Sequence, residues 1–178
     1  MIMTLEEEIK SIIRDVPNFP KEGIIFKDIS TIMLNPELSN KILDHLEHTY
    51  KDQAIDVVAG IESRGFLFGY ALAMRLNKPF VLIRKKGKLP YEKISFDYAL
   101  EYGTATIEMH IDAVKKGQKV LIHDDLLATG GSAEAAAKLV QQAGGEIAGF
   151  NFLVALDFLN GSQKLSIISD NIINLAVY

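Results

Sequence analysis

The spacing of apolar side chains divides the sequence into two parts. In residues 4–16 and again in residues 36–50, apolar positions return every three or four residues, which places them on one face of a helix. Thr4 and Glu7 add a capping box at the start of the first segment. We therefore expect two amphipathic helices in the N-terminal part of the chain, separated by a segment punctuated by Pro and Gly.

The pattern then changes to continuous apolar runs. These runs are IDVVAG (55–60), FVLIRK (80–85), KVLIHD (119–124) and IAGFNFLVAL (147–156). Because polar residues do not alternate within them, each run is typical of a strand buried on both faces. Helical patterns over residues 64–77 and 131–145 lie between the runs, and IINLAVY (172–178) fits a last strand. The alternation predicts an α/β fold with an open, mainly parallel twisted sheet flanked by helices.

Length and composition narrow the class of protein. A chain of 178 residues suits a single domain, 1–178, with a sizeable core. The net charge of −4 without a basic block argues against a nucleic-acid partner, and the absence of Cys excludes disulfides and thiolate metal sites. The acidic N-terminal segment lacks an apolar signal core, and no apolar stretch is long enough to cross a membrane. We therefore expect a cytoplasmic protein.

A glycine-rich turn, ATGGS, follows the run at 119–124 and opens the helix after it. Gly130 and Gly131 allow a ligand to approach the backbone, and Thr129 and Ser132 add hydroxyl groups. Free N–H groups and the helix dipole favour a phosphate there, although a tight turn without a ligand fits the same residues. The turn lacks the Lys of a Walker A loop and the glycine spacing of a dinucleotide fingerprint.

Two carboxylates, Asp124 and Asp125, stand directly before this turn. They would repel a bare phosphate, so they are expected to face another part of the same ligand. A ribose diol supplies two hydroxyl donors for two carboxylates, which makes a sugar phosphate the favoured ligand. The alternative is a pair of Asp residues that cap the turn by bonding local N–H groups.

The stretch VLIHDDLLATGGSA resembles the phosphoribosyl-pyrophosphate signature of the type I phosphoribosyltransferases. Four further blocks resemble the adenine-using branch of that family, in the family's order, so that the resemblance runs from about residue 17 to 157. These blocks are FPKEGIIFKDIS, GIESRGFLFG, RKKGKLP and LEYGTATIEMH. The resemblance implies that adenine and phosphoribosyl pyrophosphate become AMP and pyrophosphate, with Mg²⁺ carried by the substrate and no protein residue assigned as a metal ligand. It also implies a homodimer, a base-binding hood segment (1–35) and a flexible lid loop (85–104).

Site residues follow from the same resemblance. The ribose and 5′-phosphate belong to Asp124, Asp125 and the turn Ala128, Thr129, Gly130, Gly131 and Ser132. Pyrophosphate is assigned to Ser63, Arg64, Arg84 and Lys88, the last two in cis or across a dimer interface. The turn that holds Ser63 often has a cis non-proline peptide in the family. Without the resemblance, Arg64 would fit a surface ion pair equally well, and the basic run after residue 83 a solvated face.

The base and the proton transfer are assigned to two other segments. Adenine is expected to stack on Phe26 and Leu126 and to be read by the main chain around Ile25 and Lys27. Core packing is the alternative role of Phe26. Glu101, in LEYG, takes the family's acid/base role.

Three positions depart from the family pattern. Lys27 stands where Arg is expected, Ser132 where Thr is usual, and His123 where an apolar residue is normal. We expect His123 to be a hydrogen-bonded residue beneath the ribose loop rather than a catalytic one. The competing functions are transfer to another purine (hypoxanthine, guanine or xanthine), a regulator that binds the sugar phosphate without turnover, and a plain nucleotide-binding module.

Overall fold

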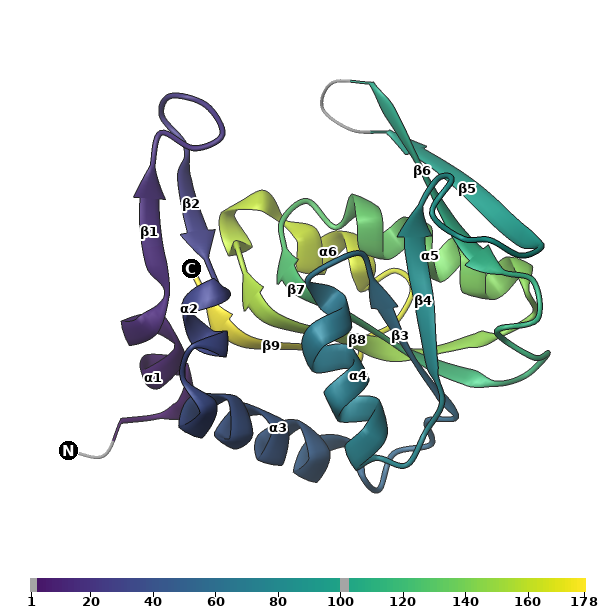
Figure 1. The fold of residues 1–178 in the computed structure, drawn as a ribbon, viewed down its shortest axis with the longest axis horizontal. Coiled ribbons are helices and arrows are strands. Elements are labelled where there is room, and N and C mark those ends of the chain that lie inside the picture. Colours follow the sequence, from purple (N-terminus) through teal and green to yellow (C-terminus); the bar gives the residue numbers. More distant parts are fainter. Residues whose placement is uncertain (1–2, 100–102) are drawn as a thin grey trace.

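The computed structural model describes residues 3–99 and 103–178. In these residues, seven strands form one sheet in the order β5-β6-β4-β3-β7-β8-β9 (Figure 1). The strands are β3 (Val57–Ile61), β4 (Phe80–Lys85), β5 (Lys93–Ala99), β6 (Thr104–His110), β7 (Lys119–Leu127), β8 (Glu146–Ala155) and β9 (Ile172–Val177). Strands β4, β3, β7, β8 and β9 pair in parallel, while β5 and β6 extend the β4 edge in antiparallel pairing. The predicted mainly parallel α/β sheet is confirmed.

Helices cover both faces of this sheet (Figure 1). The helices are α1 (Leu5–Ile12), α2 (Ser30–Met33), α3 (Pro36–Tyr50), α4 (Gly65–Arg75), α5 (Gly131–Gln142) and α6 (Gly161–Leu165), with a short 3₁₀ turn at Asp157–Leu159. Along β7, Val120 and Ile122 pack in the cluster under α5, whereas Leu121 packs in the cluster under α3 and α4. Successive side chains of a strand point to opposite faces, so this division explains why the strand sequences are apolar without alternation.

The N-terminal segment differs from the expected helix over residues 4–16. Helix α1 keeps the predicted capping box but ends at Ile12, and Arg14–Pro17 (β1) then pairs antiparallel with Ile25–Asp28 (β2). These two strands form a separate small sheet that stands beside the main one (Figure 1). Their side chains are mostly exposed or half-buried, so neither strand has the apolar run that identified the strands of the main sheet.

The segment 85–104, expected as a loop, also contains regular structure. Strand β5 pairs along its length with β6, from Lys93 opposite His110 to Ala99 opposite Thr104. Its exposed and half-buried residues alternate, and Phe96 and Tyr98 pack inward against the core under α5. Glu101 lies outside the described residues. Within the part of the chain that the structure describes, no helix is both long and apolar enough to cross a membrane.

Candidate active site at the carboxyl edge of the sheet

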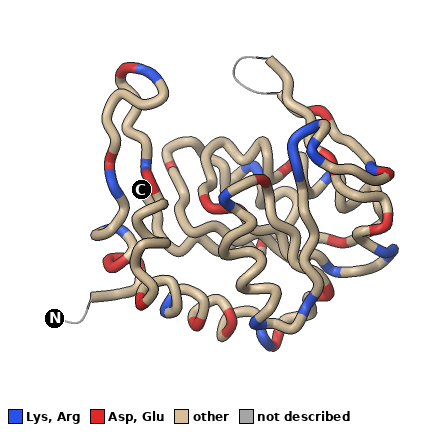
Figure 2. Tube along the Cα trace, viewed as in Figure 1, with Lys and Arg blue, Asp and Glu red and all other residues tan. Residues whose placement is uncertain are grey.

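Strands β3, β4 and β7 end at the same edge of the sheet because they are neighbours that run in parallel. In open α/β sheets this edge is where ligands bind. The turns β3–α4 and β7–α5 therefore lie next to each other, although they are far apart in the sequence. Figure 2 shows acidic and basic segments side by side at this edge rather than one basic patch.

The β7–α5 turn is an open cradle of small residues. Gly130 is the N-cap of α5 with φ of 81°, a left-handed conformation that favours glycine, and no side chain caps this helix. By contrast, Thr4 and Asn35 cap α1 and α3 with side-chain oxygens. The turn lines a cavity of about 240 Å³, the β7–α5 cavity. Its lining includes all five predicted residues of the turn, Ala128, Thr129, Gly130, Gly131 and Ser132, together with Asp124 and Leu126.

The β3–α4 turn contains a basic side chain, Arg64, that is already in an ion pair. The Nε of Arg64 donates a hydrogen bond to Asp125 Oδ2 at 2.6 Å. The same guanidinium lies 5.6 Å from the ring centroid of Phe26, which connects the small N-terminal sheet to the turn. The Glu62–Ser63 peptide is cis, as the family resemblance implied. Residues of this turn line a second cavity of about 290 Å³, the β3–α4 cavity, together with Asp124, Asp125 and Leu126.

The two adjacent carboxylates stand in different surroundings. Asp125 is buried, with 5% of its surface exposed, and is held by Arg64. Asp124 lines both cavities and accepts a hydrogen bond from the Asp125 amide at 2.9 Å. Burial raises the pKa of Asp124 well above its ordinary value, and the neighbouring charge of Asp125 raises it further. The two predicted ribose ligands are therefore at the site, and one of them, Asp125, is paired with Arg64.

Arg84 and Lys88 lie on the β4 side of the same edge. Arg84 Nε donates to Glu62 Oε2 at 3.1 Å, and its Nη1 donates to the Lys88 carbonyl at 3.0 Å. Burial alone would raise the pKa of Glu62, but bonds from the Lys85 amide and Arg84 outweigh it and leave that pKa lowered. The Lys88 side chain is exposed. The basic run is therefore placed at the site edge, with Arg84 bound to a carboxylate of the protein.

The residues assigned to adenine come from two elements. Ile25, Phe26 and Lys27 lie on β2, and Phe26 packs edge-on against Phe19 with ring centroids 5.1 Å apart. Lys27 is turned toward Asp15, at 2.6 Å, and lies over the Tyr178 ring. This placement leaves the Lys27 side chain occupied. Leu126 lines both cavities.

Comparison with known proteins assigns the family. The family described as "Phosphoribosyl transferase domain" matches residues 29–167. The adenine phosphoribosyltransferase of Cytophaga hutchinsonii is 53% identical over 162 residues, covering 91% of this chain and 90% of the relative. The chain belongs to the adenine phosphoribosyltransferase family.

Solved structures of this family have the same fold. The crystal structure of the adenine phosphoribosyltransferase from Thermoanaerobacter pseudethanolicus is 48% identical and covers 98% of this chain and 100% of its own, with a TM-score of 0.93. The Saccharomyces cerevisiae enzyme, crystallised with an imino-altritol bisphosphate and adenine, is 42% identical and covers 98% and 99% of the two chains, with a TM-score of 0.88. The fold and family expected from the sequence are thus confirmed.

His123, which departs from the family pattern, lies in a polar contact inside the core. Its Nδ1 is 2.7 Å from Asn151 Oδ1, on the strand position paired with it in β8. The ring is fully buried, and burial lowers the pKa of His123 to about 4, so it is neutral at pH 7. A neutral ring held by Asn151 under the turn agrees with the expected hydrogen-bonded residue.

The site residues assigned from the sequence leave out polar side chains that the structure places around the site, among them Glu62, Asn151 and Tyr98. Glu62 is adjacent to Ser63 in GIESRG, so its proximity to the turn was readable although its pairing with Arg84 was not. Asn151 interrupts an apolar run, which is a signal for a buried polar contact. Tyr98 reaches the β7–α5 turn from a strand that was not predicted. Within residues 3–99 and 103–178, no three His, Asp or Glu side chains are grouped as a metal site.

Proposed function

We propose that this protein, a member of the adenine phosphoribosyltransferase family, acts in purine salvage and converts adenine and phosphoribosyl pyrophosphate to AMP and pyrophosphate. One observation carries the proposal beyond family membership. Two turns suited to anions flank the carboxylates Asp124 and Asp125 at one sheet edge, and their two cavities share Asp124 and Leu126. A ribose with phosphate at one end and pyrophosphate at the other has the same order of groups.

The 5′-phosphate end of the substrate fits the β7–α5 turn. Backbone N–H groups at the start of α5, the helix dipole and the hydroxyls of Thr129 and Ser132 are donors suited to a dianion. Asp124 and Asp125 then accept hydrogen bonds from the ribose hydroxyls. We propose that in this step Asp125 exchanges its bond with Arg64 for a bond with the sugar.

The pyrophosphate end fits the β3–α4 turn. When Arg64 turns from Asp125, its guanidinium can bind pyrophosphate. Ser63 lines the cavity of this turn, and Arg84 and Lys88 lie beside it, at and just after the end of β4. As the bond from ribose C1 to pyrophosphate oxygen breaks, its electron pair leaves with pyrophosphate, and these cations stabilise the added negative charge. The ring that remains has oxocarbenium character, and the carboxylates below it provide a negative field.

The carboxylates at this edge are poor candidates for a metal cage, because Asp125 is bound to Arg64 and Glu62 to Arg84. We therefore propose that Mg²⁺ binds through the oxygens of the substrate, where it would add positive charge beside the leaving group. The protein's own contribution there is to orient the pyrophosphate through Arg64 and Arg84.

The base side of the reaction uses the small N-terminal sheet. Adenine N9 forms the new bond to ribose C1, with Phe26 and Leu126 as apolar surfaces for the purine ring. Backbone groups of β2 around Ile25 and Lys27 read the adenine edge, whose N6 donates and whose N1 accepts. Glu101 holds or transfers the proton at purine N7, a role that rests on the family resemblance.

We also propose that the protein is a homodimer. Leu67, Tyr70 and Met74 are 49%, 55% and 61% exposed and repeat at helical spacing along one side of α4. Leu82 of β4 is 39% exposed as well. An exposed apolar stripe of this kind suits contact with a second copy. Sedimentation equilibrium at micromolar concentration tests it, and a monomer mass would contradict it. A cytoplasmic location and the absence of a nucleic-acid partner remain predictions from composition.

One assay tests the proposed reaction. The protein is incubated with phosphoribosyl pyrophosphate, Mg²⁺ and adenine, hypoxanthine, guanine or xanthine in turn, and pyrophosphate release is measured. We expect rapid release with adenine and at least a hundredfold slower release with the other bases, because a site that reads hydrogen-bonding groups rejects a mismatched edge strongly. Release with a 6-oxopurine instead indicates another purine specificity, and binding without release indicates a regulator. A Glu101→Gln variant that keeps the wild-type turnover rate would remove Glu101 from the mechanism.

A further inference from the structure

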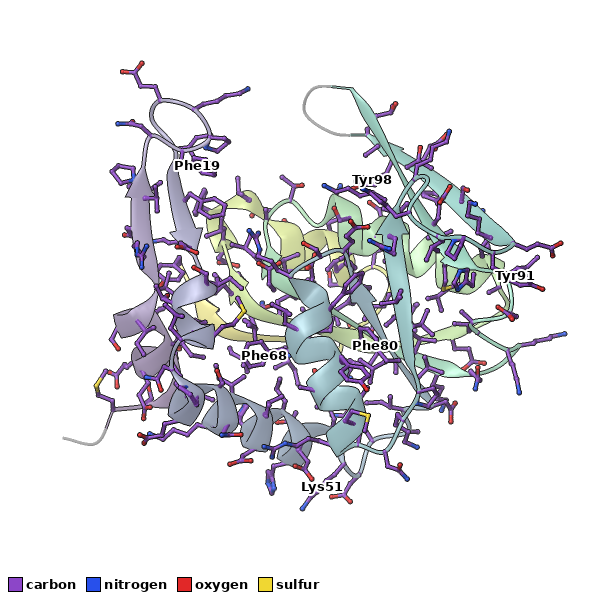
Figure 3. All side chains as sticks on the ribbon, viewed as in Figure 1. Phe19, Lys51, Phe68, Phe80, Tyr91 and Tyr98 are labelled. Carbon is purple, nitrogen blue, oxygen red and sulfur yellow. The ribbon has the colours of Figure 1, made fainter. Side chains whose placement is uncertain are left out.

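A tyrosine from outside the glycine-rich turn reaches into the β7–α5 cavity. Tyr98 (labelled in Figure 3) lies on β5, and its hydroxyl is 3.1 Å from Ser132 Oγ in the first turn of α5. Tyr98 and Ala99 line the cavity together with the residues of the turn. The contact therefore joins the edge hairpin to the turn that the sequence pattern assigned to phosphate.

The backbone holds Tyr98 in this position. Its residue pairs with Ala105 of β6, and the alternation along β5 directs Tyr98, like Phe96, toward the core under α5. A Cβ atom placed on Gly131 would lie 3.7 Å from Tyr98 Cδ2, so the ring is in van der Waals range of the turn. The phenol is half-buried, which limits the positions that its hydroxyl can take.

The composition of the cavity wall gives this hydroxyl its importance. None of the described residues that line the β7–α5 cavity is Lys or Arg. Lys164, whose side chain approaches Gly130, is paired with Glu134 at 3.5 Å. A phosphate bound there would depend on neutral donors, so each hydroxyl would contribute a substantial part of the binding.

The two hydroxyls can also donate to a common acceptor. In the contact between Tyr98 and Ser132, one hydroxyl donates its hydrogen and the other keeps its hydrogen available. A phosphate oxygen placed between them could accept hydrogen bonds from both once the hydroxyl that donates in their mutual bond turns to the phosphate. No bond has to be broken to an ionised group, in contrast to the Arg64 contact with Asp125.

We propose that the Tyr98 hydroxyl is a direct ligand of the substrate's 5′-phosphate, supplied by β5 and acting beside Ser132. This inference rests on the proposed function, because it assigns the β7–α5 cavity to that phosphate. It makes Tyr98 a determinant of specificity for a phosphorylated sugar. It also puts a bound phosphate in contact with β5, the strand that precedes Glu101 in the sequence.

The test uses Tyr98→Phe, which keeps the ring and its packing and removes only the hydroxyl. Calorimetric titration with ribose 5-phosphate is expected to show roughly tenfold weaker binding, the usual loss for a hydrogen bond to a charged group. Titration with pyrophosphate is expected to be unchanged. In steady-state assays, KM for phosphoribosyl pyrophosphate rises by a similar factor while KM for adenine changes by less than about twofold.

A matched control is Tyr91→Phe, since Tyr91 is exposed and contacts His110 rather than the turn. This control is expected to match the wild type in every assay. Ser132→Ala and the double variant Tyr98→Phe/Ser132→Ala separate a direct bond from an indirect effect. If Tyr98 contacts the phosphate itself, Tyr98→Phe still weakens ribose 5-phosphate binding in the Ser132→Ala background.

The inference is overturned if Tyr98→Phe binds ribose 5-phosphate as the wild type does, or if its effect vanishes in the Ser132→Ala background. Failure of the proposed function looks different. In that case the wild-type protein itself neither binds ribose 5-phosphate nor releases pyrophosphate with adenine.

Discussion

The two strand-to-helix turns at the carboxyl edge of the sheet differ in their charged groups. In the β3–α4 turn, Arg64 is bound to Asp125 at 2.6 Å, and close by Arg84 is bound to Glu62 at 3.1 Å. In the β7–α5 turn, the described lining has no basic residue and the helix starts at an uncapped glycine. One turn contains cations that are already paired with carboxylates of the protein, and the other contains neutral donors that line a cavity.

This difference determines what each turn must do when it binds. The β7–α5 turn is preorganised, because a phosphate can bind its N–H and hydroxyl donors without breaking an ion pair. In the proposed mechanism the β3–α4 turn exchanges partners, so that pyrophosphate replaces Asp125 on Arg64 and the ribose hydroxyls replace Arg64 on Asp125. The two exchanges compensate each other only when both groups are bound at the same time, and a single ligand that carries both meets this condition in one binding step. The intact substrate is therefore expected to bind far better than pyrophosphate alone.

Replacing Arg64 with Gln is expected to give the largest separation between the turns. Pyrophosphate binding should weaken by about 10- to 100-fold, because a hydrogen-bonding cation is removed from the leaving-group site. Ribose 5-phosphate binding should stay the same or tighten, since Asp125 is freed for the sugar. Calorimetric titration of the two ligands measures both effects. An equal loss for both ligands would show that the turns do not act separately.

Replacing Gly130 with Ala perturbs the other turn. Gly130 has φ of 81°, and a Cβ there would lie 3.1 Å from the Gly161 carbonyl oxygen. The left-handed conformation costs a residue with a Cβ about 1–2 kcal/mol, so we expect lower stability and roughly tenfold weaker ribose 5-phosphate binding, with pyrophosphate binding retained.

Gly117→Ala is the matched control for this change. Gly117 has φ of 78° with nothing within 4 Å of an added Cβ, and it precedes β7, at the opposite end of that strand from the β7–α5 turn. It should therefore lose a similar free energy of unfolding in urea denaturation while binding ribose 5-phosphate normally. Normal phosphate binding by Gly130→Ala itself would remove the β7–α5 turn from the phosphate site.

Replacing Asp124 with Asn is expected to have the smallest effect, a rise of a few degrees in Tm at pH 7. The pKa of Asp124 is raised in the folded protein, so this residue costs stability at every pH above the ordinary value of 3.8, and the cost is complete above the folded pKa. The cost shrinks as the pH falls and is gone below the ordinary carboxyl value of 3.8. Thermal scans between pH 7 and pH 4 should show the advantage of the variant decreasing. A variant that melts below the wild type at pH 7 contradicts this expectation, and a gain accompanied by weaker sugar binding would mark a carboxylate kept for function.

Sequence patterns predicted well those helices and strands in which the buried apolar side chains follow one clear pattern along the element. Helix α3 spans Pro36–Tyr50, as its periodicity predicted, and the four apolar runs all became strands of the main sheet. Strands β1, β2, β5 and β6 were missed. The residues of β1, β2 and β5 are exposed or half-buried, so no continuous apolar run marks them. The buried stretch of β6 is short and includes the acidic residue Glu108. In β5 the apolar residues do alternate with polar ones, because Ile94, Phe96 and Tyr98 occupy every second position.

The sequence predicted which residues belong to the site, but it did not predict which of them contact each other. Spacing and residue type indicated the anion turn and its two carboxylates. Nothing local indicates that Arg64 meets Asp125, 61 positions later, because that contact depends on β3 lying beside β7. The pairing of His123 with Asn151 likewise depends on the register between β7 and β8.

The exchange of partners between Arg64 and Asp125 is tested most directly by a crystal structure with ribose 5-phosphate and pyrophosphate bound together. We expect the 5′-phosphate on the backbone of residues 128–132, the ribose hydroxyls on Asp124 and Asp125, and Arg64 turned from Asp125 to pyrophosphate. A complex in which both ligands are bound while Arg64 remains on Asp125 would contradict the account.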